Sequence, residues 1–189
     1  MSEITQSSVL AEAREKMTKA LDHLEHELST IRTGRANPAL IEHLPISYYG
    51  TPTPLNQLAQ IGTPEARLLV VQPYDRSYVG TIDKAIREAG LGLNPSNDGQ
   101  LVRVPIPQLT EERRREYVRL AKQRAEESRV AIRNARRDEI QRVQRAEKAG
   151  EVPADESHKI SDGLQKLTDE MVGRVDERVH RKEAEVMEV

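Results

Sequence analysis

Apolar residues recur in steps of three and four along three long segments of the chain, and this spacing is typical of helices that pack along a narrow seam. The segments run from about residue 8 to 33, from 110 to about 149, and from 153 to about 185. Their seams are Leu10, Ala13, Met17, Leu21, Leu24, Leu28 and Ile31; Val118, Ala121, Ala125, Ser128, Ile132 and Ala135; and Ile160, Leu164, Leu167, Met171, Val175 and Val179. Because such helices bury their seams only against each other, the pattern predicts an elongated antiparallel three-helix bundle.

Local signals indicate where these helices begin and end. Thr110 is placed to cap the second helix with its hydroxyl, and Glu111 and Glu112 suit the positive end of the helix dipole. Gly150 is expected to stop that helix. At the end of the first helix, Gly34 would let the chain leave in a conformation that a side chain would resist.

The middle of the chain differs from its ends, because nine of the ten prolines and seven of the ten glycines lie between residues 34 and 107. Proline and glycine interrupt long helices, so residues 35–107 are expected to form a compact insert of short elements. We expect strands at 44–49, 67–72 and 100–106 and turns at 50–54 and 94–95. One short helix is expected to carry Ile82, Ala85, Ile86 and Ala89 on one face and to end at Gly90. The predicted class is therefore α+β, with a small β/α/β domain inserted after the first helix.

The second helical segment is strongly basic. Residues 113–148 hold thirteen Lys or Arg and six Asp or Glu, a local charge of +7 in a chain whose net charge is −2. On a helix, Arg115, Lys122, Arg129, Arg133 and Arg136 fall within about 40° of one line beside the apolar seam. A basic stripe on a rigid helix can lie along a phosphate backbone, which predicts a polyanionic partner. The alternative is a solvated bundle face whose arginines pair with nearby carboxylates.

The chain carries few of the groups that catalysis or metal binding requires. The absence of cysteine excludes disulfides and thiolate chemistry and fits a reducing compartment such as the cytoplasm. Only His23 and His26, beside Glu27, could approach each other on one helix face, and we interpret them as surface histidines rather than metal ligands. No catalytic or nucleotide-binding motif, secretory signal or membrane-spanning run occurs. We therefore expect a cytoplasmic monomer that is not an enzyme and has no catalytic residue, metal, cofactor or membrane partner.

Five blocks of sequence, in order along nearly the whole chain, together resemble the bacterial ribosome recycling factor family. They are Ile31–Pro38 (IRTGRANP), Tyr48–Leu55 (YYGTPTPL), Leu91–Pro95 with Asp98–Gly99, Leu109–Arg114 (LTEERR) and Arg129–Asp138 (RVAIRNARRD). The resemblance implies an L-shaped molecule in which a helical domain (1–34 and 108–189) and a β/α/β domain (35–107) are joined by two hinges. The hinges correspond to Gly34, Arg35, Ala36 and Asn37 and to Pro105, Ile106, Pro107 and Gln108.

The function that the resemblance implies is disassembly of the post-termination ribosome. The helical domain would bind large-subunit ribosomal RNA near the peptidyl-transferase region, while elongation factor G, using GTP, drives the smaller domain. The protein itself would hydrolyse nothing. The residues expected to contact RNA by this resemblance are Arg32, Arg133 and Arg136, followed by Arg35, Arg114, Lys122 and Arg129.

Two other classes of function fit parts of the pattern. A non-ribosomal coiled-coil adaptor would direct the same basic stripe at an acidic protein. A sequence-specific DNA binder fits less well, because the basic residues share a helix with a bundle seam and no recognition-helix motif occurs. The sequence assigns no ligand to the small domain.

Overall fold

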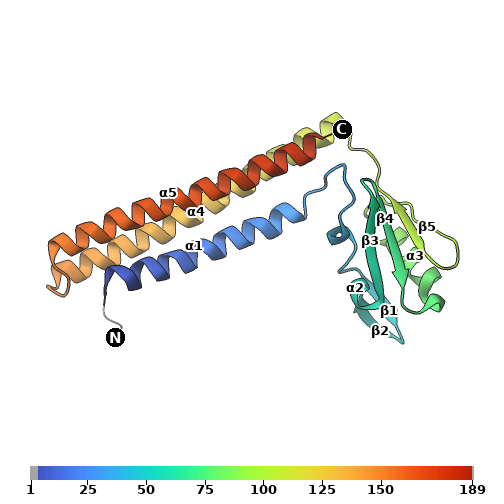
Figure 1. The fold of residues 1–189 in the computed structure, drawn as a ribbon, viewed down its shortest axis with the longest axis horizontal. Helices are drawn as coiled ribbons and strands as arrows, with labels where there is room; N and C mark the ends of the chain where they lie inside the picture. Colours follow the sequence, from blue (N-terminus) through green and yellow to red (C-terminus); the bar gives the residue numbers. More distant parts are fainter. Residues whose placement is uncertain (1–3, 189) are drawn as a thin grey trace. The chain divides into compact units, whose positions relative to one another are not determined.

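The computed structural model describes residues 4–188, which form two compact units. The first contains the described residues up to Ile31 together with Glu116–Ala184, and the second contains Arg32–Arg115 and the residues from Glu185 onward. Long helices build the first unit and short strands dominate the second, so the predicted α+β class is confirmed (Figure 1). The predicted domain limits at residues 34 and 108 differ from these unit boundaries by three and eight residues, and the residues from Glu185 onward were predicted in the helical domain. The domain limits stay a prediction.

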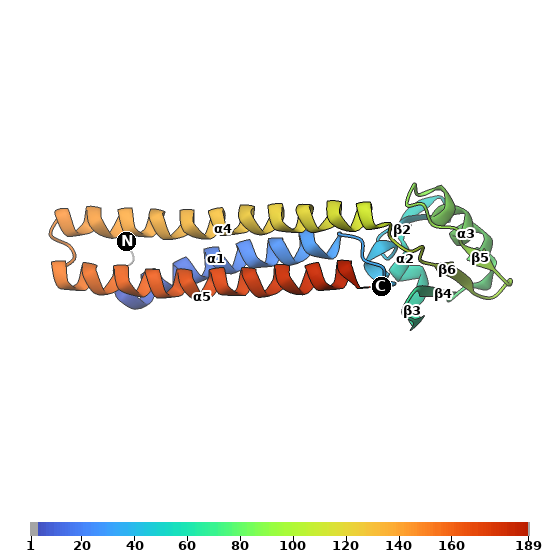
Figure 2. The same cartoon turned by 90° about the horizontal axis from the view of Figure 1, so that it is seen from above.

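Three helices lie side by side in the first unit: α1 (Gln6–Ser29), α4 (Glu111–Lys148) and α5 (Ala154–Met187). Figure 2 shows that α4 runs opposite to α1 and α5, which confirms the antiparallel bundle. Large side chains of α1 and α5 pack with smaller ones of α4, so the core is narrow. The buried seams include Val9, Ala13, Met17, Leu21, Leu24 and Leu28 on α1; Ala121, Ala125, Ser128, Ile132 and Ala135 on α4; and Ile160, Leu164, Leu167, Met171, Val175 and Val179 on α5. Val118, predicted as part of the α4 seam, is only half-buried.

The first turn of α1 buries a different residue from the predicted one. Val9 is fully buried, whereas Leu10 is only half-buried. Leu10 lies over Gly163 of α5, where an added Cβ would come within 3.2 Å of both Leu10 methyl groups. Sequence spacing allowed either residue to lead the seam, and the packing of α1 on α5 selects Val9.

Helix α1 also ends earlier than predicted. Its last residue is Ser29 rather than Thr33, although the Ile31 side chain beyond it is only 4% exposed. Apolar spacing marks burial, and here burial continues after the helix stops. The predicted role of Gly34 in ending the helix is therefore wrong: its φ lies outside the left-handed region, and an added Cβ would make only an ordinary contact with the Glu188 carbonyl at 3.6 Å.

The predicted ends of α4 are confirmed by hydrogen bonds. The Arg113 N–H donates to Thr110 Oγ1 at 3.2 Å, so Thr110 caps the N-terminus. At the other end Gly150 has a φ of 75°, and its N–H donates to the Glu147 carbonyl at 3.0 Å. The next N–H, from Glu151, donates to the Ala146 carbonyl at 2.9 Å. This double closure around a left-handed glycine ends the helix and begins the turn into α5.

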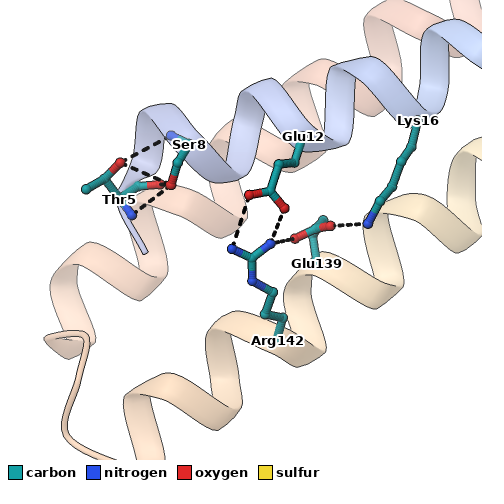
Figure 3. Close-up of polar contacts among 6 residues, drawn as sticks. All are labelled: Thr5, Ser8, Glu12, Lys16, Glu139 and Arg142. Carbon is teal, nitrogen blue, oxygen red and sulfur yellow. Dashed lines mark hydrogen bonds and ion pairs between the residues drawn. The ribbon is translucent and has the colours of Figure 1, made fainter. Parts of the chain in front are cut away.

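A charged network crosses the bundle between α1 and α4 (Figure 3). Glu139 is 1% exposed, and its two oxygens accept bonds from Lys16 Nζ at 2.5 Å and from Arg142 Nη1 at 3.1 Å. Arg142 also binds both carboxylate oxygens of Glu12. The hydrogen bond from Arg142 holds the pKa of Glu12 below its ordinary value. A buried carboxylate is thus compensated by two cations from different helices.

Sequence reasoning found only one strand of the first hairpin in the second unit, the predicted strand at 44–49. Residues 51–54, predicted as a turn, form strand β2 (Thr51–Pro54), which pairs antiparallel with β1 (Pro45–Tyr48). The turn itself is only Tyr49-Gly50, with φ values of 47° and 79°, as in a two-residue hairpin. Because the Tyr48–Thr51 pair closes this hairpin, Pro52 and Pro54 fall at positions whose N–H would face away from the partner strand. Proline is therefore compatible with this strand.

A four-stranded antiparallel sheet in the order β3-β4-β6-β5 forms the rest of the second unit. The predicted strands at 67–72 and 100–106 and the predicted short helix correspond to β4, β6 and α3. The remaining elements are β3 (Ala59–Glu65), β4 (Leu68–Pro73), β5 (Ser96–Asn97), β6 (Val102–Pro105), α3 (Val79–Glu88), α2 (Leu55–Leu58) and the 3-10 turns Pro38–Leu40 and Arg76–Tyr78. Alternate residues of β4 and β6 pack against α3, as in the pair Leu69 and Val104.

The turn before β6 depends on one carboxylate. Asp98 accepts bonds from the N–H groups of Leu101 at 2.9 Å and Gln100 at 3.0 Å, and from Arg103 Nη1 at 2.9 Å. The Leu101 bond, then Arg103 and the Gln100 bond, lower the pKa of Asp98 to about 2. The ionised side chain therefore orders the turn at neutral pH.

Replacing Asp98 with alanine should lower the melting temperature of the second unit at neutral pH. Because the folded-state pKa of Asp98 is depressed, its stabilisation of the folded state is present above the ordinary value of 3.8 and is lost as the pH falls towards about 2. Thermal unfolding followed by tyrosine fluorescence should therefore show wild type and variant converging in acid. Glu88→Ala, which removes an exposed pair with Lys84, is the control and should change little. If the melting temperature of Asp98→Ala stays below that of wild type by the same amount at every pH, this account is contradicted.

Candidate nucleic-acid interface

The predicted basic stripe lies on the side of α4 that faces α5. Arg129 contacts Asp176 and Arg136 contacts Gln165, and both of these partners belong to α5. Two members of the stripe therefore contact a second helix. A rigid two-helix surface of this kind can hold cationic side chains at fixed spacing.

Arg129 of the stripe is largely enclosed, with a side chain only 20% exposed. Its Nη2 donates to Asp176 Oδ1 at 2.6 Å, its Nε to the same oxygen at 3.1 Å, and its Nη1 to Glu126 at 3.0 Å. Burial alone would lower the pKa of Arg129, but the bonds to Asp176 and Glu126 together raise it. Arg129 thus fits the alternative interpretation, an arginine paired within the bundle, and its first role is to join α4 to α5.

Arg133 and Arg136 make fewer hydrogen bonds within the bundle than Arg129 does. Arg133 is 51% exposed and makes one bond of 3.3 Å to Glu126, a residue of its own helix that is itself 56% exposed. Arg136 donates to the neutral amide oxygen of Gln165 at 2.6 Å. Exposed contacts of this kind contribute little to folding, so either guanidinium can exchange them for a phosphate at small cost.

The basic residues on the α1 side of α4 are neutralised across the helix interface. Arg124 pairs with Glu27 at 3.2 Å, and Arg142 pairs with Glu12 and Glu139. These arginines serve bundle packing.

The remaining predicted residues of α4 differ in their surroundings. Lys122 is exposed and makes no ion pair with any residue between 4 and 188. Arg115 pairs with Glu111 one turn earlier in the helix. Arg114 is half-buried, and its Nε is buried without a hydrogen-bond partner.

Arg32 and Arg35 belong to the second unit, on the connection that follows α1. Arg32 resembles Arg114 in that one nitrogen, Nη2, is buried without a partner. Arg35 is exposed and pairs with Glu188. Of the seven residues predicted to contact RNA, four share one surface of α4: Lys122, Arg129, Arg133 and Arg136. The other three, Arg32, Arg35 and Arg114, lie outside this surface.

Several predicted hinge residues are held in the second unit. The Ala36 N–H donates to the Ala66 carbonyl at 2.7 Å, and the Ile106 N–H donates to the Arg67 carbonyl at 2.8 Å. Pro105 ends β6, and Ile106 is 4% exposed. Pro107 and Gln108, which follow Ile106, are exposed, and the hinge itself stays a prediction.

Sequence reasoning missed a cluster of aromatic side chains on the second unit. Four of the five tyrosines of the chain gather there, and three of them form a contacting group: Tyr48 with Tyr49 at 4.6 Å and Tyr48 with Tyr78 at 5.1 Å between ring centroids. The adjacent tyrosines before Gly50 were a usable signal, because a two-residue hairpin places its turn residues at a surface.

Neither a metal centre nor a membrane span is found among residues 4–188. No group of three or more His, Asp or Glu side chains is arranged to hold a metal ion, and His23 and Glu27 instead line a shallow groove between α1 and α4. No described helix is both long and apolar enough to cross a bilayer.

Comparison with known proteins agrees with the sequence resemblance. A family model for "Ribosome recycling factor" matches residues 24–187. The ribosome-recycling factors of Rubrobacter xylanophilus and Saccharopolyspora erythraea are 51% and 53% identical over 180 residues, covering 95% of this chain and 97% of each relative.

Two solved structures resemble the chain over nearly all of its length. A solution structure of a ribosome recycling factor covers 100% of both chains, with a TM-score of 0.77 and 39% identity. The second is the T. thermophilus ribosome recycling factor, in a structure with E. coli elongation factor G bound to the E. coli post-termination complex. It has a TM-score of 0.67 and 45% identity and covers 98% of this chain and 100% of its own.

Proposed function

The chain belongs to the ribosome recycling factor family, and on this premise we propose that it disassembles the post-termination ribosome together with elongation factor G and GTP. The observation that carries this proposal is the 45% identity, over 98% of the chain, to a recycling factor placed with elongation factor G on a post-termination complex. The protein acts in the cytoplasm, as a monomer, and hydrolyses nothing itself. GTP hydrolysis belongs to the elongation factor.

The bundle is the ribosome-binding part in this proposal. Arg133 and Arg136 contact large-subunit ribosomal RNA, supported by Lys122 and Arg129 on the same surface of α4. What favours the first two is that, among residues 4–188, neither pairs with a carboxylate of another helix, and that Arg133 is half exposed. Arg129 orients the surface by binding Asp176, so it contributes mainly through the position of its neighbours. Arg32, Arg35 and Arg114 form a second group that contacts RNA beside the connections between the units.

The small domain performs the later step. Elongation factor G moves it after the bundle has bound, and the connections at Gly34–Arg35 and Pro107–Gln108 absorb the movement. Short single-chain connections constrain a domain less than a broad packed interface does. Ala36 and Ile106 move with the small domain, since their hydrogen bonds tie them to the turn between β3 and β4.

A ribosome-splitting assay tests the proposal. Post-termination ribosomes incubated with the protein, elongation factor G and GTP should separate into subunits, measured by light scattering and by sucrose-gradient sedimentation. Omission of any one component, or substitution of a non-hydrolysable GTP analogue, should prevent splitting. Splitting without the elongation factor, or none with factors from several bacteria, would contradict it. Association that survives nuclease digestion of the ribosomes would instead favour an adaptor for an acidic protein.

A further inference from the structure

The tyrosine cluster of the second unit surrounds a small notch that the proposed function does not use. The notch encloses about 110 Å³ and is lined by Tyr48, Gln57, Leu58, Tyr74, Asp75 and Tyr78. That is the space of three or four water molecules, which suits the end of one side chain rather than a folded element. Tyr49 stands beside it, with ring contacts to Tyr48 and Tyr78.

Two of these tyrosines are not needed by the domain core. Tyr49 is 80% exposed and Tyr74 is 73% exposed, whereas Tyr78 packs partly against the buried residues of the sheet and α3. The core therefore explains Tyr78 but leaves the two exposed rings without a packing role. In a chain with no Trp or Phe, this gathering of aromatic surface is a conspicuous departure from the rest of the composition.

The backbone at Tyr49 adds a second observation. Tyr49 is the one residue other than glycine with positive φ between residues 4 and 188. Asn or Asp normally occupies this position of a two-residue hairpin, because a bulky side chain is disfavoured there. The strained placement holds the ring against Tyr48 and Tyr78 at the edge of the notch.

The side chains that line the notch favour a cation as its ligand. Aromatic ring faces attract ammonium and guanidinium groups, and Asp75 supplies a carboxylate at the same place. Hydrogen bonds from the side chain and backbone of Ser77 lower the pKa of Asp75, so it is ionised at neutral pH. Both bonds go to Oδ1, at 2.7 and 2.9 Å, so Oδ2 can accept from a ligand. The same carboxylate repels phosphate, which disfavours a nucleic acid strand.

We propose that this tyrosine notch is a docking site for a lysine or arginine side chain presented by a protein partner. The cation enters against the faces of Tyr48, Tyr74 and Tyr78 and donates a hydrogen bond to Asp75 Oδ2. The inference rests on the notch alone and does not require the proposed function.

Tyrosine-ring NMR tests the site directly, because the chain has only five tyrosines and Tyr117 of α4 serves as an internal reference. The full chain, labelled with 13C-tyrosine, is titrated with Ac-Gly-Arg-Gly-NH2 and with the same peptide carrying citrulline, which is nearly the same shape but uncharged. The arginine peptide should shift the resonances of Tyr48, Tyr74 and Tyr78 saturably and leave Tyr117 unchanged. The citrulline peptide should give no saturable shift.

Two variants separate the contribution of the Asp75 carboxylate to binding from that of the Tyr74 ring. Asp75→Asn can still accept the Ser77 bonds and should weaken binding of the arginine peptide about fivefold, the factor for an exposed ion pair of ~1 kcal/mol. Tyr74→Leu keeps apolar area without the ring face and should weaken it by a similar factor. Equal shifts with both peptides, or no shift at the notch, would overturn the proposal. Stronger shifts with a short oligoadenylate than with the arginine peptide would also overturn it, in favour of base stacking.

Discussion

Replacing Arg142 with methionine is expected to lower the free energy of unfolding of the bundle by about 3 kcal/mol, near the low end of the range for breaking a buried ion pair. Arg142 joins α4 to α1 by binding Glu12 and Glu139, and the Glu139 side chain is only 2% exposed. Methionine keeps much of the aliphatic length but donates no hydrogen bond. The buried carboxylate would then retain Lys16 as its remaining cation in the network of Figure 3. Urea unfolding followed by far-ultraviolet circular dichroism measures the loss.

Arg14→Met is the matched control for this prediction. Arg14 also joins two helices through a carboxylate, Glu170, but both side chains are well exposed, at 51% and 40%. Its loss should cost only ~0 to 1 kcal/mol. Adding Glu139→Leu to the Arg142 variant should restore most of the stability, because the buried carboxylate that has lost one of its two cations is then removed as well. Equal losses for the Arg142 and Arg14 variants would show that burial of Glu139 carries no penalty.

The difference in stability between wild type and the Arg142→Met variant should also depend on pH. Because Arg142 lowers the folded-state pKa of Glu12, the stabilisation from this bond is present above the unfolded-state pKa. It is lost as the pH falls through the lower folded-state value. Wild-type protein should therefore lose this contribution in acid, while the Arg142 variant has none to lose. The gap between the two should narrow as the pH falls.

The helical framework was predictable because its signal repeats many times. Each seam offers six or more apolar or small residues at regular spacing, so a single error such as Leu10 for Val9 shifts one residue and leaves the helix correct. The end of α1 was not predictable in the same way. Ile31 continues the apolar spacing while the backbone has already left the helix, because burial and helical geometry are separate properties.

The missed strands had no side-chain pattern to reveal them. Most residues of β3 are exposed, so no alternation of apolar and polar residues marks it. The sequence of β2, Thr-Pro-Thr-Pro, contains the residue type that ordinarily argues against a strand. Both strands are held by backbone hydrogen bonds to a neighbour. Such pairing depends on tertiary arrangement rather than on local propensity.

The candidate site was predictable in its location on α4 but not in its internal order. Helical spacing placed Arg129, Arg133 and Arg136 on one face. They differ in their partners on α5, which brings the carboxylate of Asp176 to Arg129 and the neutral amide of Gln165 to Arg136. The register between two helices decides which arginine is neutralised, and a single helix pattern carries no information about register.

Replacing Arg133 and Arg136 together with alanine is expected to weaken ribosome binding at least tenfold, because a hydrogen bond to a charged group contributes about 1.5–3 kcal/mol and tenfold corresponds to ~1.4 kcal/mol. The log–log dependence of affinity on salt should become shallower by roughly 0.7 to 0.9 for each phosphate that the variant no longer neutralises. The melting temperature should stay nearly unchanged, since Arg133 is half exposed and its partner Glu126 lies on the same helix. Binding is measured by ribosome pelleting at several salt concentrations.

The charge-matched control is Arg14→Ala with Arg174→Ala. These two arginines share Glu170 on the α1 side of α5, so the double variant removes the same charge from the bundle but none from the stripe. It should retain both the affinity and the salt slope of the wild type. Arg129→Ala cannot serve the same purpose, because removal of the Asp176 bond would disturb folding as well as binding. If the Arg133 and Arg136 variant also behaves like wild type, this face is solvated surface only, and RNA binding must depend on Arg32, Arg35 and Arg114, two of which hold a buried nitrogen without a hydrogen-bond partner.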